Sequence, residues 1–200
     1  KKKVILIMGL PGSGKTTLAK EIVKILNADW LNADNIRGKH KDWDFSKKGI
    51  IRQVKRMRVL ATKSIKKYVV ADFVCPIREQ LEIFKPDFII WMDTIQTSRF
   101  KSMNKIFKKP KSFNLRVTSK NKNFWIPEIL NNMENENIIP HRIAKKINNK
   151  INSAIILCGG RGTRLGSIGK KIPKTLVKIH GKPIIWYIIK YLLNNSVNHF

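Results

Sequence analysis

Residues 9–16 read Gly9-Leu10-Pro11-Gly12-Ser13-Gly14-Lys15-Thr16, and every other part of the chain is interpreted relative to this stretch. An apolar run from Val4 to Met8 precedes it, and a pattern typical of a helix begins at Thr17 and continues to Leu26. A glycine-rich loop between a buried strand and a helix turns its backbone N–H groups toward an anion, and the helix N-terminus adds its dipole. The stretch therefore predicts a phosphate-binding loop, or P-loop.

The spacing of Gly, four residues, Gly, Lys and Thr indicates a nucleoside triphosphate as the ligand. We expect Lys15 to act as a catalytic cation that reaches the β- and γ-phosphates, and the Thr16 hydroxyl to complete the oxygen shell of Mg²⁺. ATP as co-substrate and Mg²⁺ are thus the expected cofactors. The alternative is a glycine-rich turn that carries a lysine by chance. The residues expected to bind ATP are Gly9, Gly12, Ser13, Gly14, Lys15, Thr16 and Thr17.

The chain has 200 residues and a formal net charge of +28, which would ordinarily favour nucleic acid or an anionic surface as partner. The lysines are spread over every segment, however, and do not gather in one patch. We therefore expect small-molecule nucleotides as partners and no main role in binding nucleic acid. A homodimer stays open.

Two cysteines, Cys75 and Cys158, lie far apart in apolar runs, so neither a disulfide framework nor a metal cluster is predicted. No signal peptide and no apolar stretch of membrane-spanning length is visible. These features favour a soluble protein of the cytoplasm with no membrane partner.

Strand patterns alternate with helix patterns along the first two thirds of the chain. Ser46 is the expected N-cap of a long helix with an apolar face, and a basic amphipathic segment covers residues 97–109. This order predicts an α/β fold with a doubly wound parallel sheet and helices on both faces. The expected strands are 4–8, 30–32, 68–74, 87–92 and 113–118, a closing helix spans 127–133, and the apolar face of the long helix comprises Ile50, Val54, Met57, Ala61 and Ile65.

The composition changes after residue 131, where Asn, Lys and Glu become frequent and Pro140 interrupts the run. We therefore expect a first domain at 1–135, a linker at 136–152 and the start of a second domain at 153–200. The second domain should begin with a buried strand at 154–157 and end with an amphipathic helix at 184–193.

Three segments of the first domain resemble adenylylsulfate (APS) kinases when they are combined with the P-loop. They are Asn32-Ala33-Asp34-Asn35-Ile36-Arg37, Phe45-Ser46, and Ala71-Asp72-Phe73-Val74-Cys75-Pro76-Ile77-Arg78. The resemblance implies a P-loop kinase fold. It also implies transfer of the γ-phosphoryl group of ATP to the ribose 3′-hydroxyl of adenylylsulfate, as in sulfate assimilation.

The resemblance also implies roles for single residues. Asp34 matches the catalytic carboxylate that orients or deprotonates the acceptor hydroxyl and helps to position Mg²⁺; the alternative is a helix N-cap. Arg52 can equally be a solvated helix residue, and Phe45, which would stack on adenine, can equally belong to the core. The acceptor-binding residues that the resemblance implies are Arg37, Phe45, Arg52, Phe73 and Arg78.

This chain departs from the APS kinase pattern in ways that concern the acceptor. Asn32 stands where the family usually has Asp, and Asp72 stands where it has Ser, so that Asp72 could serve Mg²⁺ through water. The basic lid after Asp93 is shortened to Arg99-Phe100-Lys101 and its surroundings. A kinase of a cytidine-diphospho compound in surface-polysaccharide biosynthesis is therefore an alternative, and a basic nucleotide-dependent binding protein is a second one.

Residues 153–200 resemble the N-terminal part of a sugar-phosphate nucleotidyltransferase with a Rossmann-like fold. The resemblance rests on Cys158-Gly159-Gly160-Arg161-Gly162-Thr163-Arg164-Leu165, Pro173-Lys174-Thr175-Leu176 and Gly181-Lys182-Pro183. The family's metal-binding carboxylate lies beyond this length, so we expect this unit to be catalytically incomplete in these 200 residues. The residues implied in nucleotide binding are Gly159, Gly160, Gly162, Thr163, Arg164 and Lys174.

Overall fold

The computed structural model describes residues 1–121, 125–148, 154–156, 173–194 and 197. Contacts divide the chain into unit 1, Lys1–Ile143, and unit 2, Ala144–Phe200. The elements of unit 1 are β1 (Lys3–Met8), α1 (Lys15–Leu26), β2 (Asp29–Asn32), α2 (Ala33–Lys39), α3 (Lys47–Lys63), β3 (Tyr68–Phe73), α4 (Glu79–Phe84), β4 (Phe88–Met92), α5 (Lys101–Ile106), β5 (Leu115–Val117) and α6 (Trp125–Asn135). The next helix, α7 (His141–Asn148), begins in unit 1 and ends in unit 2.

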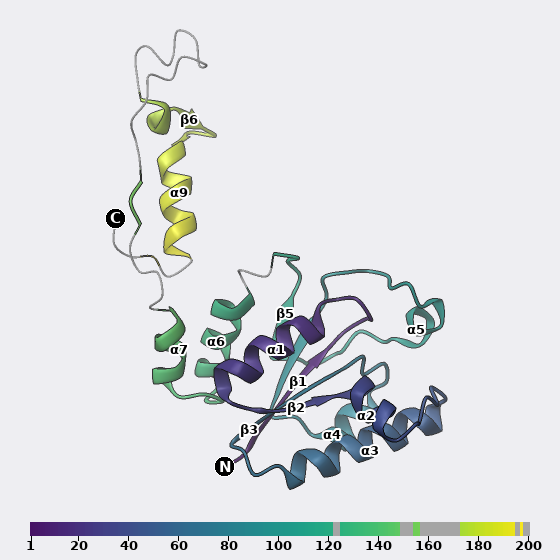
Figure 1. Cartoon of the computed structure of the whole chain (residues 1–200). Helices are drawn as coiled ribbons and strands as arrows, with labels where there is room; N and C mark the ends of the chain where they lie inside the picture. Colours follow the sequence, from purple (N-terminus) through teal and green to yellow (C-terminus); the bar gives the residue numbers. More distant parts are fainter. Residues whose placement is uncertain (122–124, 149–153, 157–172, 195–196, 198–200) are drawn as a thin grey trace. The chain divides into compact units, whose positions relative to one another are not determined.

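Unit 1 is built on a five-stranded sheet in the order β2-β3-β1-β4-β5, in which every neighbouring pair is parallel (Figure 1). Because β1 is central, the loop that follows it lies at the middle of the carboxyl edge, where open α/β sheets bind ligands. The predicted α/β fold with a parallel sheet is confirmed, and the expected strands agree with the observed ones to within two residues at each end.

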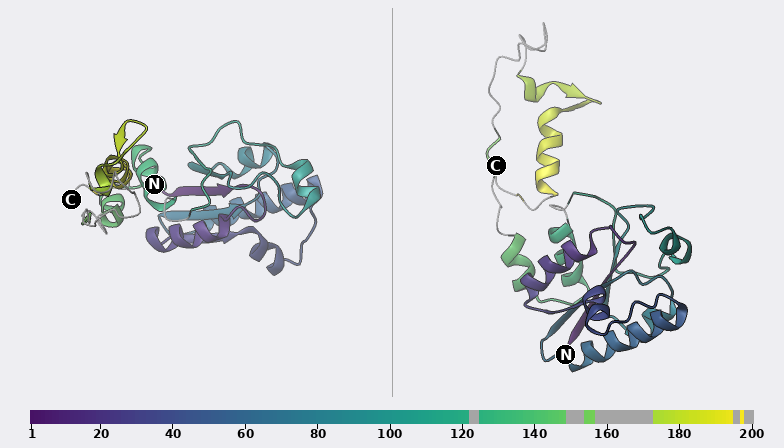
Figure 2. Two further views of the ribbon diagram at one scale, coloured as in Figure 1. Left: turned by 90° about the horizontal axis from the view of Figure 1, so that it is seen from above. Right: turned by 45° about the vertical axis from the view of Figure 1, so that its right-hand side comes forward.

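Both faces of the sheet are covered. On one face, Leu6 and Met8 of β1 pack in one core cluster with Val54 and Met57 of α3 and Phe84 of α4. On the other face α1 packs against β3 and against α6, and Figure 2 shows the two helical layers with the sheet between them. Burial on both faces explains why the residues of β1 from Val4 to Met8, and those of β3 from Tyr68 to Ala71, are apolar without alternation.

The long helix α3 begins as expected. Ser46 is its N-cap, and the Ser46 hydroxyl accepts a hydrogen bond from Gly49 N at 3.2 Å. Ile65 was placed on the apolar face of this helix, and that expectation is wrong. The helix ends at Lys63, and Ile65 is 98% exposed beyond the C-cap Ser64, because the chain there turns toward β3.

The expected linker at 136–152 contains a helix, α7, in its described part. Ile138 and Ile139 are buried after α6, and Pro140 precedes α7. The contact division falls between Ile143 and Ala144, so the boundaries at residues 135 and 153 stay predictions. The expected basic segment at 97–109 contains α5, none of whose residues is buried.

Unit 2 is described in part. Its elements are η3 (Lys174–Leu176), the antiparallel pair β6 (Lys178–Ile179) and β7 (Lys182–Pro183), and α9 (Ile184–Leu193), which matches the expected helix. The buried strand expected at 154–157 is not found in its described part. Residues 154–156 form no strand and Ile155 is 91% exposed; Leu157 lies outside the described residues. No helix within the described ranges is long and apolar enough to cross a membrane.

Gly49, in the first turn of α3, is expected to be intolerant of substitution. A Cβ built on Gly49 would lie 2.2 Å from Asp44 O and 2.4 Å from Asp44 Cγ. We predict that Gly49→Ala lowers the free energy of unfolding by about 1 to 3 kcal/mol, the usual cost of overpacking. Urea unfolding measures this change.

The matched control is Gly38→Ala in α2. The added Cβ would lie 3.8 Å from Trp43 Cζ2, which is ordinary van der Waals contact, so stability should be unchanged or slightly higher. Equal unfolding midpoints for Gly49→Ala and the wild type would contradict the close approach of residues 44 and 49.

Candidate active site

The loop after β1 has the backbone conformation that its glycines predict. Gly9, Gly12 and Gly14 have φ angles of 143°, 89° and 93°. At Gly9 a side chain is also excluded sterically, because a Cβ would lie 2.4 Å from Met92 O at the end of β4. The loop is therefore packed directly against the neighbouring strand, and its shape depends on the missing side chain.

Lys15, the first residue of α1, is held inside this loop. Its side chain is buried, with 8% of the residue exposed, and Nζ donates a hydrogen bond to Leu10 O at 2.9 Å. Burial lowers the pKa of Lys15 from 10.5 to about 8, although the charges of Asp72 and Asp34 act in the opposite direction. A cation that has lost much of its water and faces the loop is suited to bind phosphate oxygens.

Asp72, at the carboxyl end of β3, collects donors from two other elements. Thr16 Oγ1 donates to Asp72 Oδ2 at 2.7 Å and Trp30 Nε1 donates to Asp72 Oδ1 at 2.7 Å. Asn32 Nδ2 lies 3.0 Å from Oδ2 and 3.2 Å from Oδ1. These bonds join the start of α1 to β2 and β3, and they fix the Thr16 hydroxyl against the Asp72 carboxylate.

The two departures from the APS kinase pattern lie opposite each other. In the parallel pair of β2 and β3, Asn32 is the register partner of Asp72, and their side chains are hydrogen bonded. In this chain the carboxylate lies on β3 and the amide lies on β2. Asp72 is thus a buried carboxylate beside Thr16, and Asn32 is hydrogen bonded to it.

Asp34 lies in the first turn of α2, next to the carboxyl end of β2. The N-cap of α2 is Asn32, whose Oδ1 accepts a hydrogen bond from Asn35 N at 2.9 Å, so the alternative of Asp34 as N-cap is wrong. Within the described residues the Asp34 carboxylate is exposed and has no hydrogen bond or ion pair, yet it is close enough to Lys15 and Arg37 for its charge to influence the pKa of each.

Arg37, expected to hold the acceptor, is instead bonded to the loop before α3. It is buried, with 5% exposed, and Nη1 donates to Asp42 O and to Asp44 O at 3.0 Å each. Its guanidinium also lies 4.7 Å from the ring centroid of Phe45. Phe45 is 49% exposed, so the alternative of a core Phe is wrong, but one ring face is covered by Arg37.

Arg52, the second expected acceptor arginine, pairs with the same loop. Its Nε and Nη2 donate to Asp42 at 2.8 Å each, and Nη2 also reaches Asp44 Oδ2 at 3.1 Å. Arg56 Nη2 adds a bond to Asp42 Oδ2 at 3.1 Å. Hydrogen bonds from Arg52 and Arg56 hold the pKa of Asp42 well below its usual range. Arg52 is therefore an ion-paired residue and not a freely solvated one.

The two remaining acceptor residues differ in their surroundings. Phe73 is buried at the end of β3, where its ring meets Phe84 edge to face at 5.4 Å, so it belongs to the core. Arg78 is exposed and pairs with Glu82 at 3.1 Å.

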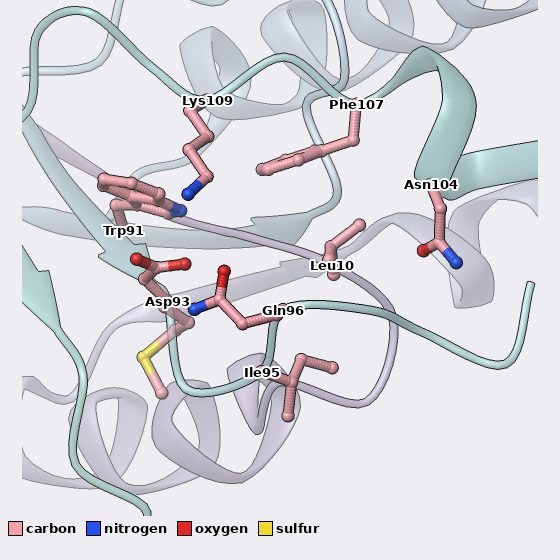
Figure 3. A pocket seen from close by; sticks show the side chains of 9 residues that line it. Leu10, Trp91, Asp93, Ile95, Gln96, Asn104, Phe107 and Lys109 are labelled. Atoms are coloured by element: carbon pink, nitrogen blue, oxygen red, sulfur yellow. The ribbon is translucent and has the colours of Figure 1, made fainter.

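Two cavities contain expected site residues or their neighbours, one beside β4 and the other beside β2. The first has a volume of about 170 Å³ and lies beside Leu10 and the end of β4. Figure 3 shows the side chains of Asp93, Gln96 and Lys109 pointing into the same space. Asp93 is also bonded to Arg116, whose Nε donates to Asp93 Oδ2 at 2.9 Å.

The second cavity has a volume of about 540 Å³ and lies beside β2 and α2. Its lining residues are Trp30, Asn32, Asp34, Asn35, Ile36, Gly38, Lys39 and Trp43. Sequence reasoning missed Trp30 and Trp43 as site residues. Their only signal was a pair of tryptophans on either side of the segment that contains Asp34.

The predicted nucleotide site of the second domain is mostly untested. Gly159, Gly160, Gly162, Thr163 and Arg164 lie outside the described residues. Lys174 lies in η3 and is exposed.

Two family models match parts of the chain. A family described as AAA domain matches residues 4–73, which contain the P-loop and the strands β1 to β3. A family described as nucleotidyl transferase matches residues 153–200.

Curated relatives match the second segment. A probable glucose-1-phosphate cytidylyltransferase of Bacillus subtilis is 51% identical over 47 residues, which is 24% of this chain and 18% of the relative. A D-glycero-alpha-D-manno-heptose 1-phosphate guanylyltransferase of Campylobacter jejuni is 52% identical over 44 residues, 22% of this chain and 20% of the relative. The chain thus spans about a fifth of the length of these relatives.

Solved structures match the first unit. The Mycobacterium tuberculosis APS kinase in complex with AMPPNP and APS superimposes with a TM-score of 0.59 at 21% identity and covers 67% of this chain and 98% of that one. The shikimate kinase of Aquifex aeolicus gives a TM-score of 0.51 at 18% identity, with 68% and 98% covered. The chain therefore combines a P-loop kinase fold with a segment similar to nucleotidyl transferases.

Proposed function

We propose that unit 1 transfers the γ-phosphoryl group of ATP to a hydroxyl group of a small nucleotide-linked acceptor. One observation carries the proposal. The P-loop buries Lys15, and the charge of Asp34, a carboxylate without a hydrogen bond or ion pair among the described residues, influences the pKa of Lys15. Phosphoryl transfer needs positioned cations on the phosphates and an acceptor for the hydroxyl proton, and these two side chains supply both.

The residues around Thr16 fit a Mg²⁺ ion. Thr16 and Asp72 offer oxygen ligands at the start of α1, and Mg²⁺ in such kinases is bound by few protein oxygens together with waters and substrate phosphates. No group of three or more His, Cys, Asp or Glu side chains in the described ranges could hold a metal by itself. When bound, the ion neutralises charge that develops on the phosphates.

The chain's own residues perform the remaining tasks in this proposal. The backbone N–H groups of the P-loop and Lys15 hold the phosphates in place. Asp34 orients the acceptor hydroxyl and takes its proton as the oxygen attacks the γ-phosphorus. The bond between the γ-phosphorus and the bridging oxygen breaks, and ADP leaves with the electron pair. A cytoplasmic location, where ATP and Mg²⁺ are supplied, is part of the proposal.

Adenylylsulfate is the first candidate for the acceptor. Its support is the match of Asp34 to Arg37 and of Phe45 to APS kinases, together with the structural likeness to such an enzyme. A cytidine-diphospho compound is the second candidate. The similarity of residues 153–200 to a probable cytidylyltransferase favours it, because that segment would then make the compound that unit 1 phosphorylates.

Competition kinetics on the full chain test the choice of acceptor. If adenylylsulfate is the acceptor, its kcat/KM should exceed that of every cytidine-diphospho compound by about 100-fold or more, because polar groups matched to one ligand are left unpaired by another. An equal or reversed preference would refute adenylylsulfate in favour of the second candidate. Absence of transfer to any member of the panel would contradict both.

The pH profile is a further prediction from Lys15. Burial lowers the pKa of Lys15 to about 8, so the free enzyme loses this positive charge as the pH rises through that value. We expect kcat/KM for ATP to be constant from about pH 6.5 to 7.5 and to fall toward tenfold per pH unit above about 8. The measurement is initial rate against ATP concentration at each pH.

Lys15→Arg is the control for this profile. A guanidinium stays protonated over the whole range, so the variant should have a lower kcat/KM without a fall near pH 8. A fall of the same shape in the variant would assign the titration to another group.

A further inference from the structure

The cavity of about 540 Å³ beside α2 is lined in part by side chains that have no role in the proposed P-loop mechanism. Two indole rings, Trp30 and Trp43, line it together with Asp34 and Lys39. Asp34 is the carboxylate assigned to the acceptor hydroxyl, so whatever fills this cavity lies next to the reacting group. A cleft with aromatic walls and a few polar groups is the usual form of a small-molecule site.

The two tryptophans have different surroundings. Trp30 is fixed, because its Nε1 donates to buried Asp72 and the Lys20 ammonium lies 6.0 Å from its ring centroid. Trp43 is 56% exposed and, among the residues that the structure describes, has no hydrogen bond or aromatic partner; it lines the cavity next to Gly38. A large exposed indole on the wall of a cavity leaves apolar surface that a planar ring can cover.

Phe45, the ring that the APS kinase resemblance assigns to base stacking, is less available. The Arg37 guanidinium lies 4.7 Å from its centroid, and Arg37 is itself fastened to the carbonyl oxygens of Asp42 and Asp44. The loop that carries Phe45 is therefore fixed from one side, while Trp43 in the same loop lines the cavity that contains Asp34.

The cavity also has a cation for an anionic group. Lys39 is exposed on its wall and has no ion pair within the described residues, whereas Arg37 and Arg52, two of the expected acceptor arginines, are already bonded to the loop before α3. The cavity therefore combines an aromatic wall, the Asp34 carboxylate and the Lys39 ammonium. These groups match a ligand that has a planar ring, a hydroxyl and a phosphate.

We propose that Trp43, with Trp30 as a second wall, is the platform on which the nucleobase of the acceptor stacks, and that Lys39 contacts an anionic group of the same molecule. This inference rests on the proposed kinase function and names the acceptor class as a nucleotide bound through its base. It places the specificity of the acceptor in residues outside the APS kinase motifs.

Binding measurements on the full chain test the platform without turnover. The probes are adenylylsulfate, AMP, CDP, CMP and ribose 5-phosphate, which lacks a base, and the method is calorimetric titration. At least one nucleotide should bind about tenfold or more tightly than ribose 5-phosphate, because stacking of one base on an aromatic side chain contributes this much. Trp43→Ala should lower the affinity for that nucleotide about tenfold or more, and Trp43→Phe should keep most of the wild-type affinity.

Two matched variants show whether the effect is specific. Phe45→Leu distinguishes the two candidate rings, because the proposal predicts a smaller loss of nucleotide affinity in this variant than in Trp43→Ala. The control Trp186→Phe, which changes an indole of unit 2 that is 38% exposed, should leave nucleotide affinity within about threefold. Equal binding of ribose 5-phosphate, unchanged affinity in Trp43→Ala, a loss in Phe45→Leu alone, or no binding of any nucleotide would overturn the platform.

Kinetics separate this inference from the kinase proposal. Phosphoryl transfer with an acceptor KM that Trp43→Ala leaves unchanged would refute the platform and retain the kinase. Nucleotide binding that depends on Trp43, without transfer to any acceptor, would refute the kinase and retain the cavity as a nucleotide site. With both correct, Trp43→Ala raises KM for the acceptor about tenfold and leaves KM for ATP unchanged.

Discussion

Replacement of Lys15 by alanine is expected to lower kcat by about 100-fold or more, the usual effect of removing one fixed electrostatic contact from a transition state. The cation is buried in the P-loop and is held by Leu10 O, so no neighbouring side chain can replace it without moving. The measurement is the rate of ADP release at saturating ATP and acceptor. The fold should persist, because removing a buried charge relieves its desolvation.

Lys24→Ala is the matched control for Lys15→Ala. Lys24 lies on the exposed side of the same helix, so its loss should leave kcat unchanged. If Lys15→Ala kept more than about a tenth of the wild-type rate, the assignment of residues 9–16 as the catalytic loop would be wrong.

Asp34→Asn is expected to lower kcat by about 100-fold or more while KM for ATP stays nearly unchanged. Asparagine keeps the shape of the side chain but cannot accept the proton of the acceptor hydroxyl. Because Asp34 has no hydrogen bond or ion pair in the described part of the chain, its replacement should not alter stability. Steady-state kinetics with each substrate varied in turn measure the effect.

Glu21→Gln serves as the control for Asp34→Asn, since Glu21 is an exposed carboxylate in the middle of α1. It should have wild-type kinetics. A collapse of ATP affinity in Asp34→Asn with kcat preserved would assign Asp34 to the donor and not to the acceptor.

Much of the fold follows from local patterns. The apolar runs at Val4–Met8 and Tyr68–Ala71 lie in β1 and β3, because strands buried on both faces carry apolar side chains without alternation. Ser46 begins α3 because its side chain caps the helix. Ile65 misled the prediction, since helical spacing alone does not show where a helix ends.

The candidate site was predicted unevenly. The P-loop residues follow from a motif whose spacing is set by the phosphate ligand, whereas the role of Asp34 is what the resemblance to APS kinases implies. The partners of Arg37 and Arg52 could not be predicted, because the loop residues Asp42 and Asp44 reach them only through the tertiary fold. The same holds for Asn32 and Asp72, which are 40 residues apart and meet only when β2 pairs with β3.

Transfer of the labelled γ-phosphate of ATP tests the central claim most directly. The full chain is incubated with γ-labelled ATP, Mg²⁺ and either adenylylsulfate or a cytidine-diphospho compound, and the products are separated and located by ³¹P NMR. The account predicts that the label appears as a phosphate monoester on a hydroxyl of one acceptor, in step with the ADP formed. Label that appears as inorganic phosphate alone, with each acceptor recovered unchanged, would contradict it.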